Sequence, residues 1–154
     1  MTVDGKEKEL VAVGISVAAG CKPCTDFHVN AARKAGASDH EIERAMVVAL
    51  SVRERATVVM KSYALKHVGG SPDVSTPADD GGQGNRLDEL VAIGSAFGVN
   101  CVSTLEQHLK SASEASISEA EVTLIARLAM YIKKRAASHV ERPTAAAEQT
   151  AGQA

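Results

Sequence analysis

Apolar residues recur at helical spacing along most of the chain, and apart from short valine-rich stretches no segment alternates like a half-buried strand. Leu10, Val13 and Val17 share one face of a helix predicted over about residues 4–19. Gly20 follows directly, and glycine is typical of the residue that ends a helix. The pattern therefore indicates an all-α protein.

Two more helices are predicted in the first half of the chain. One begins at a pair of cysteines, where Pro23 is tolerated because the first turn needs no amide donor, and it stops at Gly36. The next opens with Ser38 and Glu41, which form a capping box that satisfies free amides of the first turn. Its apolar stripe runs to about Val68.

The sequence also matches itself without a gap at an offset of 80. ELVAVGISVAAGCKPCTDFH, residues 9–28, aligns with ELVAIGSAFGVNCVSTLEQH, residues 89–108. The match continues at the capping box, which returns as Ser118 and Glu121. Because unusual residues coincide, we prefer duplication to chance, and we predict an all-α fold of two tandem three-helix repeats.

The repeat divides the chain into four parts. Residues 1–68 form a first repeat that contains the cysteine pair, and residues 86–141 form a second, degenerate repeat. Residues 69–85, rich in glycine and proline, are predicted to be a flexible linker. Residues 142–154 have no large apolar side chain and are predicted to be a disordered or loosely helical tail.

Composition narrows the class of protein. The 154 residues are 45% apolar, but only four are aromatic, so the core must come from closely packed small aliphatic side chains. The formal net charge is -2 and no basic cluster is present, which argues against a nucleic acid partner. No apolar run is long enough to span a membrane, and the polar start lacks a secretory signal, so a cytoplasmic location is expected.

The segment CKPCTDFH carries the candidate chemistry. Cys21, Cys24 and His28 stand at positions i, i+3 and i+7, which share one face of a helix. In the first turn, free amides and the helix dipole lower the pKa of a thiol, so a thiolate is accessible at cellular pH. An imidazole one turn further along can stabilise that thiolate or accept the thiol proton.

Three interpretations of this segment compete. A zinc site would have three ligands, but neither a second CxxC nor an HxxxH follows to supply a fourth. Two buried structural thiols would need no histidine nearby. A dithiol that cycles to a disulfide uses every residue of the segment, and we favour this interpretation.

Glu9 adds to the redox interpretation. A lone glutamate in a first turn is usually a solvated residue favoured by the helix dipole. However, Glu89 stands at the same distance before Cys101 in the second copy. Glu9 is therefore predicted to be a proton acceptor for the cysteine pair.

At these residues the chain resembles the alkylhydroperoxidase D-like members of the carboxymuconolactone decarboxylase superfamily. Their signature, a glutamate, eleven residues, CxxC, three residues and a histidine, is matched at Glu9, Cys21, Cys24 and His28. The resemblance implies an all-α fold, assembly into trimers or hexamers, and thiol-dependent reduction of peroxides or of a partner's disulfide. It further implies a peroxiredoxin as a protein partner and dihydrolipoamide or a similar external dithiol as reductant. We expect no bound cofactor and no metal.

The chain departs from that family at two places. Pro23 stands where the best-known members have a histidine, so the proton relay between the thiols differs. In the second copy Glu89, Cys101 and His108 are kept, but Thr104 replaces the second cysteine. We expect Cys101 to be an inert thiol in a structural half, with glutathionylation or pairing elsewhere as the alternative.

The roles of the two cysteines and of the other histidines follow from their positions. Helix-end electrostatics favour Cys21 as the attacking thiol, whereas adjacency to His28 and the resemblance favour Cys24, and we predict attack by Cys24. The remaining histidines, at positions 40, 67 and 139, are predicted to lie near helix ends without a catalytic role.

Two rival functions and the oligomeric state complete these expectations. A lactone decarboxylase is the rival function within the superfamily. The resemblance implies that such enzymes lack the cysteine pair, so the pair in this chain argues against that function. A zinc-stabilised assembly module without catalysis is the rival from another class. Because units of about 60 residues have little room for a private core, a homotrimer or homohexamer is expected.

Overall fold

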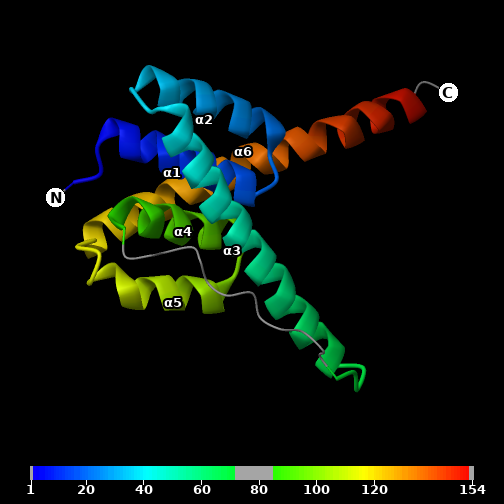
Figure 1. The fold of residues 1–154 in the computed structure, drawn as a ribbon. Helices are drawn as coiled ribbons and strands as arrows, with labels where there is room; N and C mark the ends of the chain where they lie inside the picture. The colour runs from blue at the N-terminus through cyan, green and yellow to red at the C-terminus, as the bar shows by residue number, and fades with distance from the viewer. Residues whose placement is uncertain (1, 72–84, 153–154) are drawn as a thin grey trace.

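The computed structural model describes residues 2–71 and 85–152, except for the side chains of 144–146. Within these ranges the chain folds into helices and contains no strand, which confirms the all-α prediction. The elements, shown in Figure 1, are α1 (Gly5–Ala18), α2 (Lys22–Lys34), α3 (Asp39–Lys66), α4 (Arg86–Gly98), α5 (Val102–Ala112) and α6 (Glu119–Ala151).

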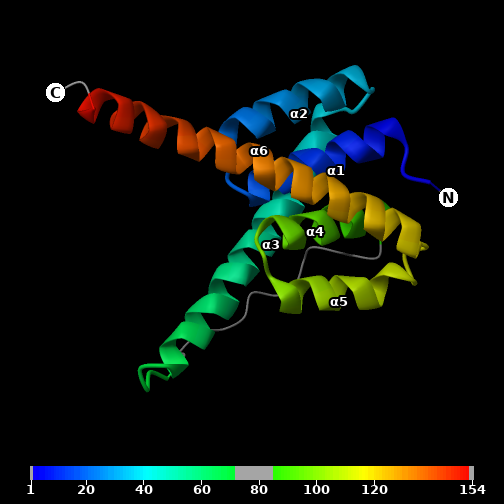
Figure 2. The same cartoon turned by 180° about the vertical axis from the view of Figure 1, so that it is seen from behind.

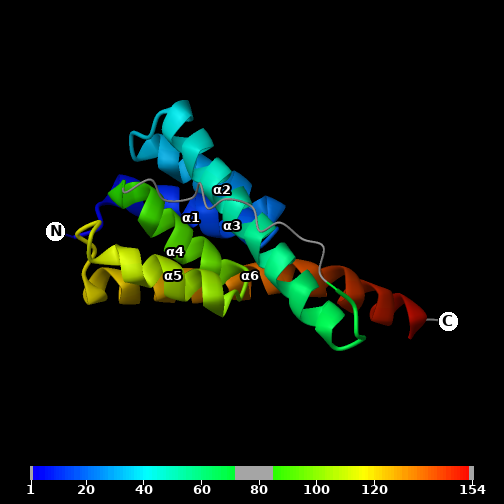
Figure 3. The same ribbon diagram turned by 60° about the horizontal axis from the view of Figure 1, so that its bottom comes forward.

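Helices α1 and α4 form the centre of the fold. Helix α1 packs against α2, α3, α4 and α6, and α4 packs against α1, α3, α5 and α6. Their apolar side chains are buried on all sides; Leu10, Ile15, Leu90 and Ile93 have no exposed surface. Figure 2 shows α6 crossing the bundle on one side, and Figure 3 shows that α3 and α6 both extend well beyond the central pair.

Glycines allow α1 and α4 to approach each other closely. A Cβ added at Gly14 would lie 2.6 Å from Val91 Cγ1, and one added at Gly94 would lie 2.9 Å from Ile15 Cγ1. These distances are shorter than van der Waals contact, so only glycine fits at either position. With few aromatic side chains in the sequence, close packing of the two helices through small residues fills the core at this crossing.

The helix boundaries predicted for the first half are confirmed within one or two residues. Helix α1 ends before Gly20, which has a φ of 72°, and α2 ends before Gly36, which has a φ of 90°. Ser38 caps α3, and its side chain and that of Glu41 form the predicted capping box. Ser118 starts α6 in the same way.

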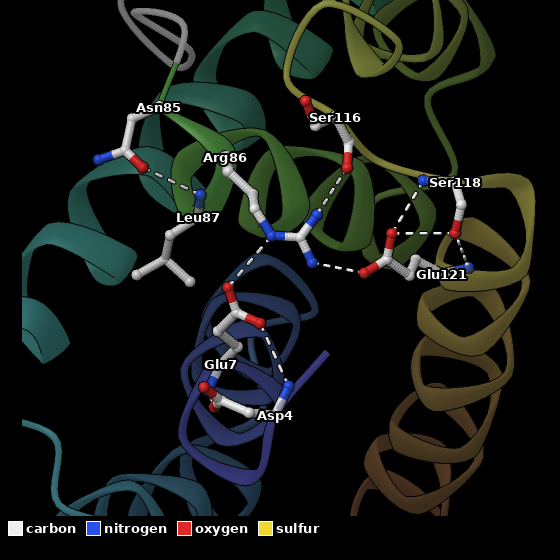
Figure 4. Close-up of polar contacts among 8 residues, drawn as sticks. All are labelled: Asp4, Glu7, Asn85, Arg86, Leu87, Ser116, Ser118 and Glu121. Carbon is white, nitrogen blue, oxygen red and sulfur yellow. Dashed lines mark hydrogen bonds and ion pairs between the residues drawn. The ribbon is translucent and has the colours of Figure 1, made fainter. Parts of the chain in front are cut away.

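A polar cluster joins the beginnings of α1, α4 and α6. Figure 4 shows the guanidinium of Arg86 between Glu7 of α1 and Glu121 of α6. Arg86 Nη1 also donates to the carbonyl oxygen of Ser116 at 2.9 Å. The hydrogen bond and charge of Arg86, together with hydrogen bonds from Ser118, hold the pKa of Glu121 at about 2. The cluster therefore fixes the three helix ends relative to one another.

The two segments predicted to lack regular structure have different outcomes. Most of the predicted linker, residues 72–84, lies outside the described residues. At the other end, α6 continues through the predicted tail to Ala151, with Pro143 inside the helix. Residues 147–152 of this extension are exposed. Among the described residues, none of the helices has the length and apolar character needed to cross a membrane.

Candidate active site

The two cysteines of the CxxC segment lie at the start of α2. Their Sγ atoms are 2.13 Å apart, at disulfide bonding distance, and their Cα atoms are 5.3 Å apart. Cys21 is the residue that caps the helix, and the backbone N–H of Cys24 donates to its Sγ at 3.2 Å. Each cysteine is only 6% exposed. Three-residue spacing within one helical turn thus brings the sulfurs together without any rearrangement of the backbone.

His28 and Glu9 form a pair beside this disulfide. His28 lies one turn after Cys24 on the buried face of α2, and its Nδ1 is 2.8 Å from Glu9 Oε2. Since an ionised carboxylate can only accept hydrogen bonds, Nδ1–H donates to Glu9, and Nε2 is the nitrogen left to exchange protons with other groups. The pair resembles the arrangement by which a carboxylate orients a catalytic imidazole.

The geometry shows which group Glu9 contacts. The sequence predicts that Glu9 is a proton acceptor for the cysteine pair. In the structure its carboxylate lies against the imidazole of His28. Glu9 can therefore act on the cysteines through His28, by fixing the tautomer and orientation of that ring.

Two cavities flank the disulfide. The larger, of about 500 Å³, is lined by Cys21, by Lys22 and Pro23 of α2, and by residues between Lys133 and Val140 in the middle of α6. The smaller, of about 230 Å³, is lined by Cys24 and His28, again with residues of α6. Each sulfur thus has its own opening toward solvent.

The sequence reasoning missed one residue of this site, His139. It was expected near a helix end without a catalytic role, but it lies inside α6, which continues to Ala151. A ring nitrogen of His139 and the sulfurs of Cys21 and Cys24 all lie within 4.8 Å of one another. Residues 132, 135, 136 and 139 share one face of a helix, but nothing in the sequence says that this face turns toward the cysteines.

The same three residues bear on the question of a metal. Two reduced cysteines and His139 would supply three of the four ligands of a tetrahedral zinc ion. However, Lys22 and Lys133 line the cavity on this side, and their positive charges oppose the binding of a dication. We therefore assign no metal ligands here.

The corresponding segment of the second half starts α5. Cys101 occupies the N-cap position of this helix, as Cys21 does in α2, but its side chain makes no capping hydrogen bond; its Sγ lies 3.1 Å from the hydroxyl oxygen of Thr104. His108 Nδ1 is 2.9 Å from Glu89 Oε2, so the imidazole and carboxylate are paired here as well. The second half therefore keeps the histidine and glutamate of the first but has a hydroxyl in place of the second thiol.

Cys101 is a buried free thiol with a shifted pKa. Burial raises its pKa, but hydrogen bonds from Thr104 and Ser103 and the charge of Arg55 outweigh burial, so the pKa is lowered overall. Cys101 also lines a cavity of about 930 Å³ together with residues of α1 and α3. The thiol is thus polarised, yet it has no cysteine beside it with which to form a disulfide.

Comparison with known proteins supports a family for the first half of the chain. No curated protein and no solved structure matches the chain. Residues 2–61, which include α1, α2, most of α3 and the residues Glu9, Cys21, Cys24 and His28, match the model of the carboxymuconolactone decarboxylase family.

Proposed function

We propose that this protein is a thiol-dependent oxidoreductase in which Cys21 and Cys24 cycle between a dithiol and a disulfide. It would reduce a peroxide or the disulfide of a partner protein, and so act in antioxidant defence. The observation that carries this proposal is the bonding distance between the two sulfurs at a helix start, beside the paired imidazole of His28 and carboxylate of Glu9. The family match of residues 2–61 adds support, because the resemblance that includes the CxxC signature lies within that family.

The oxidative half of the cycle begins at Cys24. Its thiolate attacks one oxygen of a peroxide, the O–O bond breaks, and the leaving alkoxide takes a proton to become an alcohol. Cys24 is then a sulfenic acid. The thiolate of Cys21 attacks this sulfur, the S–O bond breaks, and the hydroxide leaves as water after taking a proton. With a disulfide substrate, Cys24 forms a mixed disulfide that Cys21 resolves.

The reductive half needs an external dithiol, since two electrons and two protons must be replaced. One thiolate of that dithiol attacks the Cys21–Cys24 bond, and its second thiol then resolves the mixed disulfide. Dihydrolipoamide or a similar small dithiol is our proposed donor, and a peroxiredoxin or another disulfide protein is the proposed partner. Neither step requires a bound cofactor.

Thiol counting tests the proposal directly. The reduced protein should show three titratable thiols, and brief treatment with hydrogen peroxide should leave one, that of Cys101. A screen of dihydrolipoamide, thioredoxin and glutathione should then identify a reductant that restores all three. Cys101→Ser serves as the control and should turn over at the wild-type rate. Peroxide consumption that survives in a Cys21→Ser, Cys24→Ser double variant would sink the proposal.

Trapping separates the two cysteines. If Cys24 attacks and Cys21 resolves, Cys21→Ser accumulates a mixed disulfide through Cys24, because the second step cannot occur. Accumulation only in Cys24→Ser would reverse the roles. Mass spectrometry of the trapped adduct identifies the sulfur that carries it.

The family match keeps a decarboxylase as the second candidate. A carboxymuconolactone-type decarboxylase would need no thiol chemistry, so decarboxylation of a lactone acid should then be unaffected in the Cys21→Ser, Cys24→Ser variant. A zinc-stabilised assembly module is the third candidate. It predicts stoichiometric zinc in the purified protein and a melting temperature that falls when a chelator is added.

We further propose that the two halves are copies of one three-helix unit and that the chain assembles into a homotrimer or homohexamer. Cysteines at equivalent N-cap positions and equivalent histidine–glutamate pairs at an offset of 80 support the first point. Exposed apolar side chains on the outer helices support the second, among them Val47, Leu50, Met60, Met130 and Val140. Light scattering of the purified protein measures the oligomeric mass; a monomer would contradict the assembly.

A further inference from the structure

We propose that His139 of α6 is a second catalytic imidazole, which exchanges the proton of Cys21 as the disulfide opens and closes. This inference rests on the proposed redox cycle and adds a residue that the CxxC segment does not contain. It begins from distance: a ring nitrogen of His139 lies within 4.8 Å of both sulfurs. Among the described residues, the group of cysteine, histidine and carboxylate side chains that gathers at the disulfide consists of Cys21, Cys24 and His139. His28 does not belong to this group.

His28 lines one of the two cavities, whereas His139 lines both. His28 lines the smaller cavity together with Cys24. Cys21 lines the larger cavity, and the imidazole on that side is His139. Since His139 also lines the smaller cavity, its ring stands between the two openings. A proton that leaves or reaches Cys21 thus has the imidazole of His139 within 4.8 Å of its sulfur, in the same cavity.

The charges around the disulfide favour thiolate chemistry. Lys22 of α2 and Lys133 of α6 line the larger cavity, although Lys133 Nζ also donates to the side chain of Asn100. Arg135 and Tyr131 of α6 line the smaller one beside His28 of α2. The carboxylate that α1 contributes, Glu9, is bound to the ring of His28. Positive groups therefore surround both sulfurs, and such groups stabilise a thiolate that leaves an opened disulfide.

In the reductive half, a thiolate of the external dithiol attacks Cys24 Sγ. A sulfur–sulfur bond forms to Cys24, the Cys21–Cys24 bond breaks, and its electron pair leaves on Cys21. Imidazolium at His139 then donates a proton to that thiolate. In the oxidative half the neutral ring takes the same proton back, so Cys21 becomes the thiolate that attacks the sulfenic acid or mixed disulfide on Cys24. Histidine suits this role because its side chain changes charge roughly between pH 5 and 8.

The assignment explains why the first half needs the second for chemistry. The residues of the CxxC segment lie in α2 or, for Cys21, at its N-cap, but His139 reaches them from the helix that ends the second half. Tyr131, Arg135 and His139 occupy the same part of α6 and line the same cavity. The second half would thus contribute to the active site through α6, even though its own cysteine lacks a partner.

The test uses full-length variants in which one cysteine remains. In Cys24→Ser, Cys101→Ser only Cys21 reacts with iodoacetamide, and in Cys21→Ser, Cys101→Ser only Cys24 reacts. Alkylation rates are measured from pH 5 to 10 in the presence of a metal chelator. His139→Gln should lower the rate of Cys21 at pH 7 by about tenfold and move its profile to higher pH, because an opposite charge within about 4–6 Å shifts a pKa by 1 unit or more. His28→Gln should affect Cys24 more than Cys21.

His40→Gln is the matched control, since His40 lies in the first turn of α3, and it should leave both profiles unchanged. Circular dichroism verifies that each variant is folded. A second measurement uses His139→Ala in the otherwise unchanged chain: added imidazole should restore its rate of reduction by dithiol. An unchanged Cys21 profile in His139→Gln, or equal shifts at both cysteines, overturns the assignment. Because alkylation needs no peroxide and no turnover, this outcome is independent of the thiol counts that test the redox cycle.

Discussion

The two halves of this protein place the same imidazole and carboxylate in different surroundings. In the first half the side chains of His28 and Glu9 are 10% and 21% exposed, whereas those of His108 and Glu89 are each 3% exposed. His28 reaches a cavity that also contains Cys24, but the cavity beside Cys101 includes neither Thr104 nor His108. The same pair is thus accessible to a substrate in one half and enclosed in the other.

A histidine–glutamate pair can serve both a catalytic and a structural purpose. A buried imidazole bound to a carboxylate satisfies two polar groups at once and fixes two helices relative to each other. When a second cysteine and an opening are present, the same pair is placed to move protons. Reactivity therefore depends on the two thiols and on a cavity through which a substrate can reach them, and not on the histidine–glutamate pair alone.

The largest effect is expected when the second half receives the thiol that it lacks. Since Cys101 Sγ lies 3.1 Å from Thr104 Oγ1, a cysteine in place of Thr104 should form a second disulfide on oxidation. Oxidised Thr104→Cys should then have no titratable thiol under denaturing conditions, where the oxidised wild type has one. Thr104→Ser is the control and keeps that thiol. A thiol that persists in oxidised Thr104→Cys would mean that the two segments are not equivalent in backbone geometry.

The next effect concerns stability. His108→Ala leaves Glu89 buried without the hydrogen bond from its imidazole partner, and losing a buried hydrogen bond to a charged group costs about 2–3 kcal/mol. His28→Ala should cost about 1 kcal/mol, because water can reach the carboxylate of Glu9, whose side chain is 21% exposed. Urea unfolding measures both values. Equal losses would show that the difference in burial does not govern the energetics of the two pairs.

A smaller and more symmetrical effect is expected where α1 crosses α4. Gly14→Ala and Gly94→Ala should each destabilise the protein by about 1–3 kcal/mol, since the added Cβ overlaps Val91 in one case and Ile15 in the other. Gly5→Ala is the matched control at the start of α1, where a Cβ meets nothing within 4 Å. Thermal or urea unfolding serves as the measurement. A neutral result at Gly14 would mean that the central helices separate readily.

The smallest effect is a pH dependence that also differs between the halves. Lys6 and Ser38 lower the pKa of Glu41 from its ordinary 4.5 to about 2, as Arg86 does for Glu121. Each carboxylate therefore adds stability above about pH 4.5 that is lost as the pH falls toward 2. Glu121→Gln should flatten the acid dependence of the unfolding free energy more than Glu41→Gln, because the side chain of Glu121 is 4% exposed and that of Glu41 is 32% exposed. The opposite order would contradict this assignment.

Several features of the site could be predicted from the sequence because they are local. The distance between Cys21 and Cys24 follows from their three-residue spacing in one turn, and the cap at Ser38 follows from the SDHE segment. The helical end of the chain is a different case. Residues 142–154 have too little apolar surface to predict a packed helix, yet α6 continues as far as Ala151. The helix extends because each added residue continues the hydrogen bonding of the preceding turns. Burial does not explain it, since residues 147–152 are exposed.

The helices of the first half, their caps and the short distance between the two cysteines could be predicted, since each depends on interactions between residues no more than about four positions apart. The contact between Glu9 and His28 and the position of His139 beside the disulfide could not, because they depend on how α1, α2 and α6 pack. Helix packing is set by the shapes of all the buried side chains together, and periodicity along one helix does not record which neighbour its polar residues will meet.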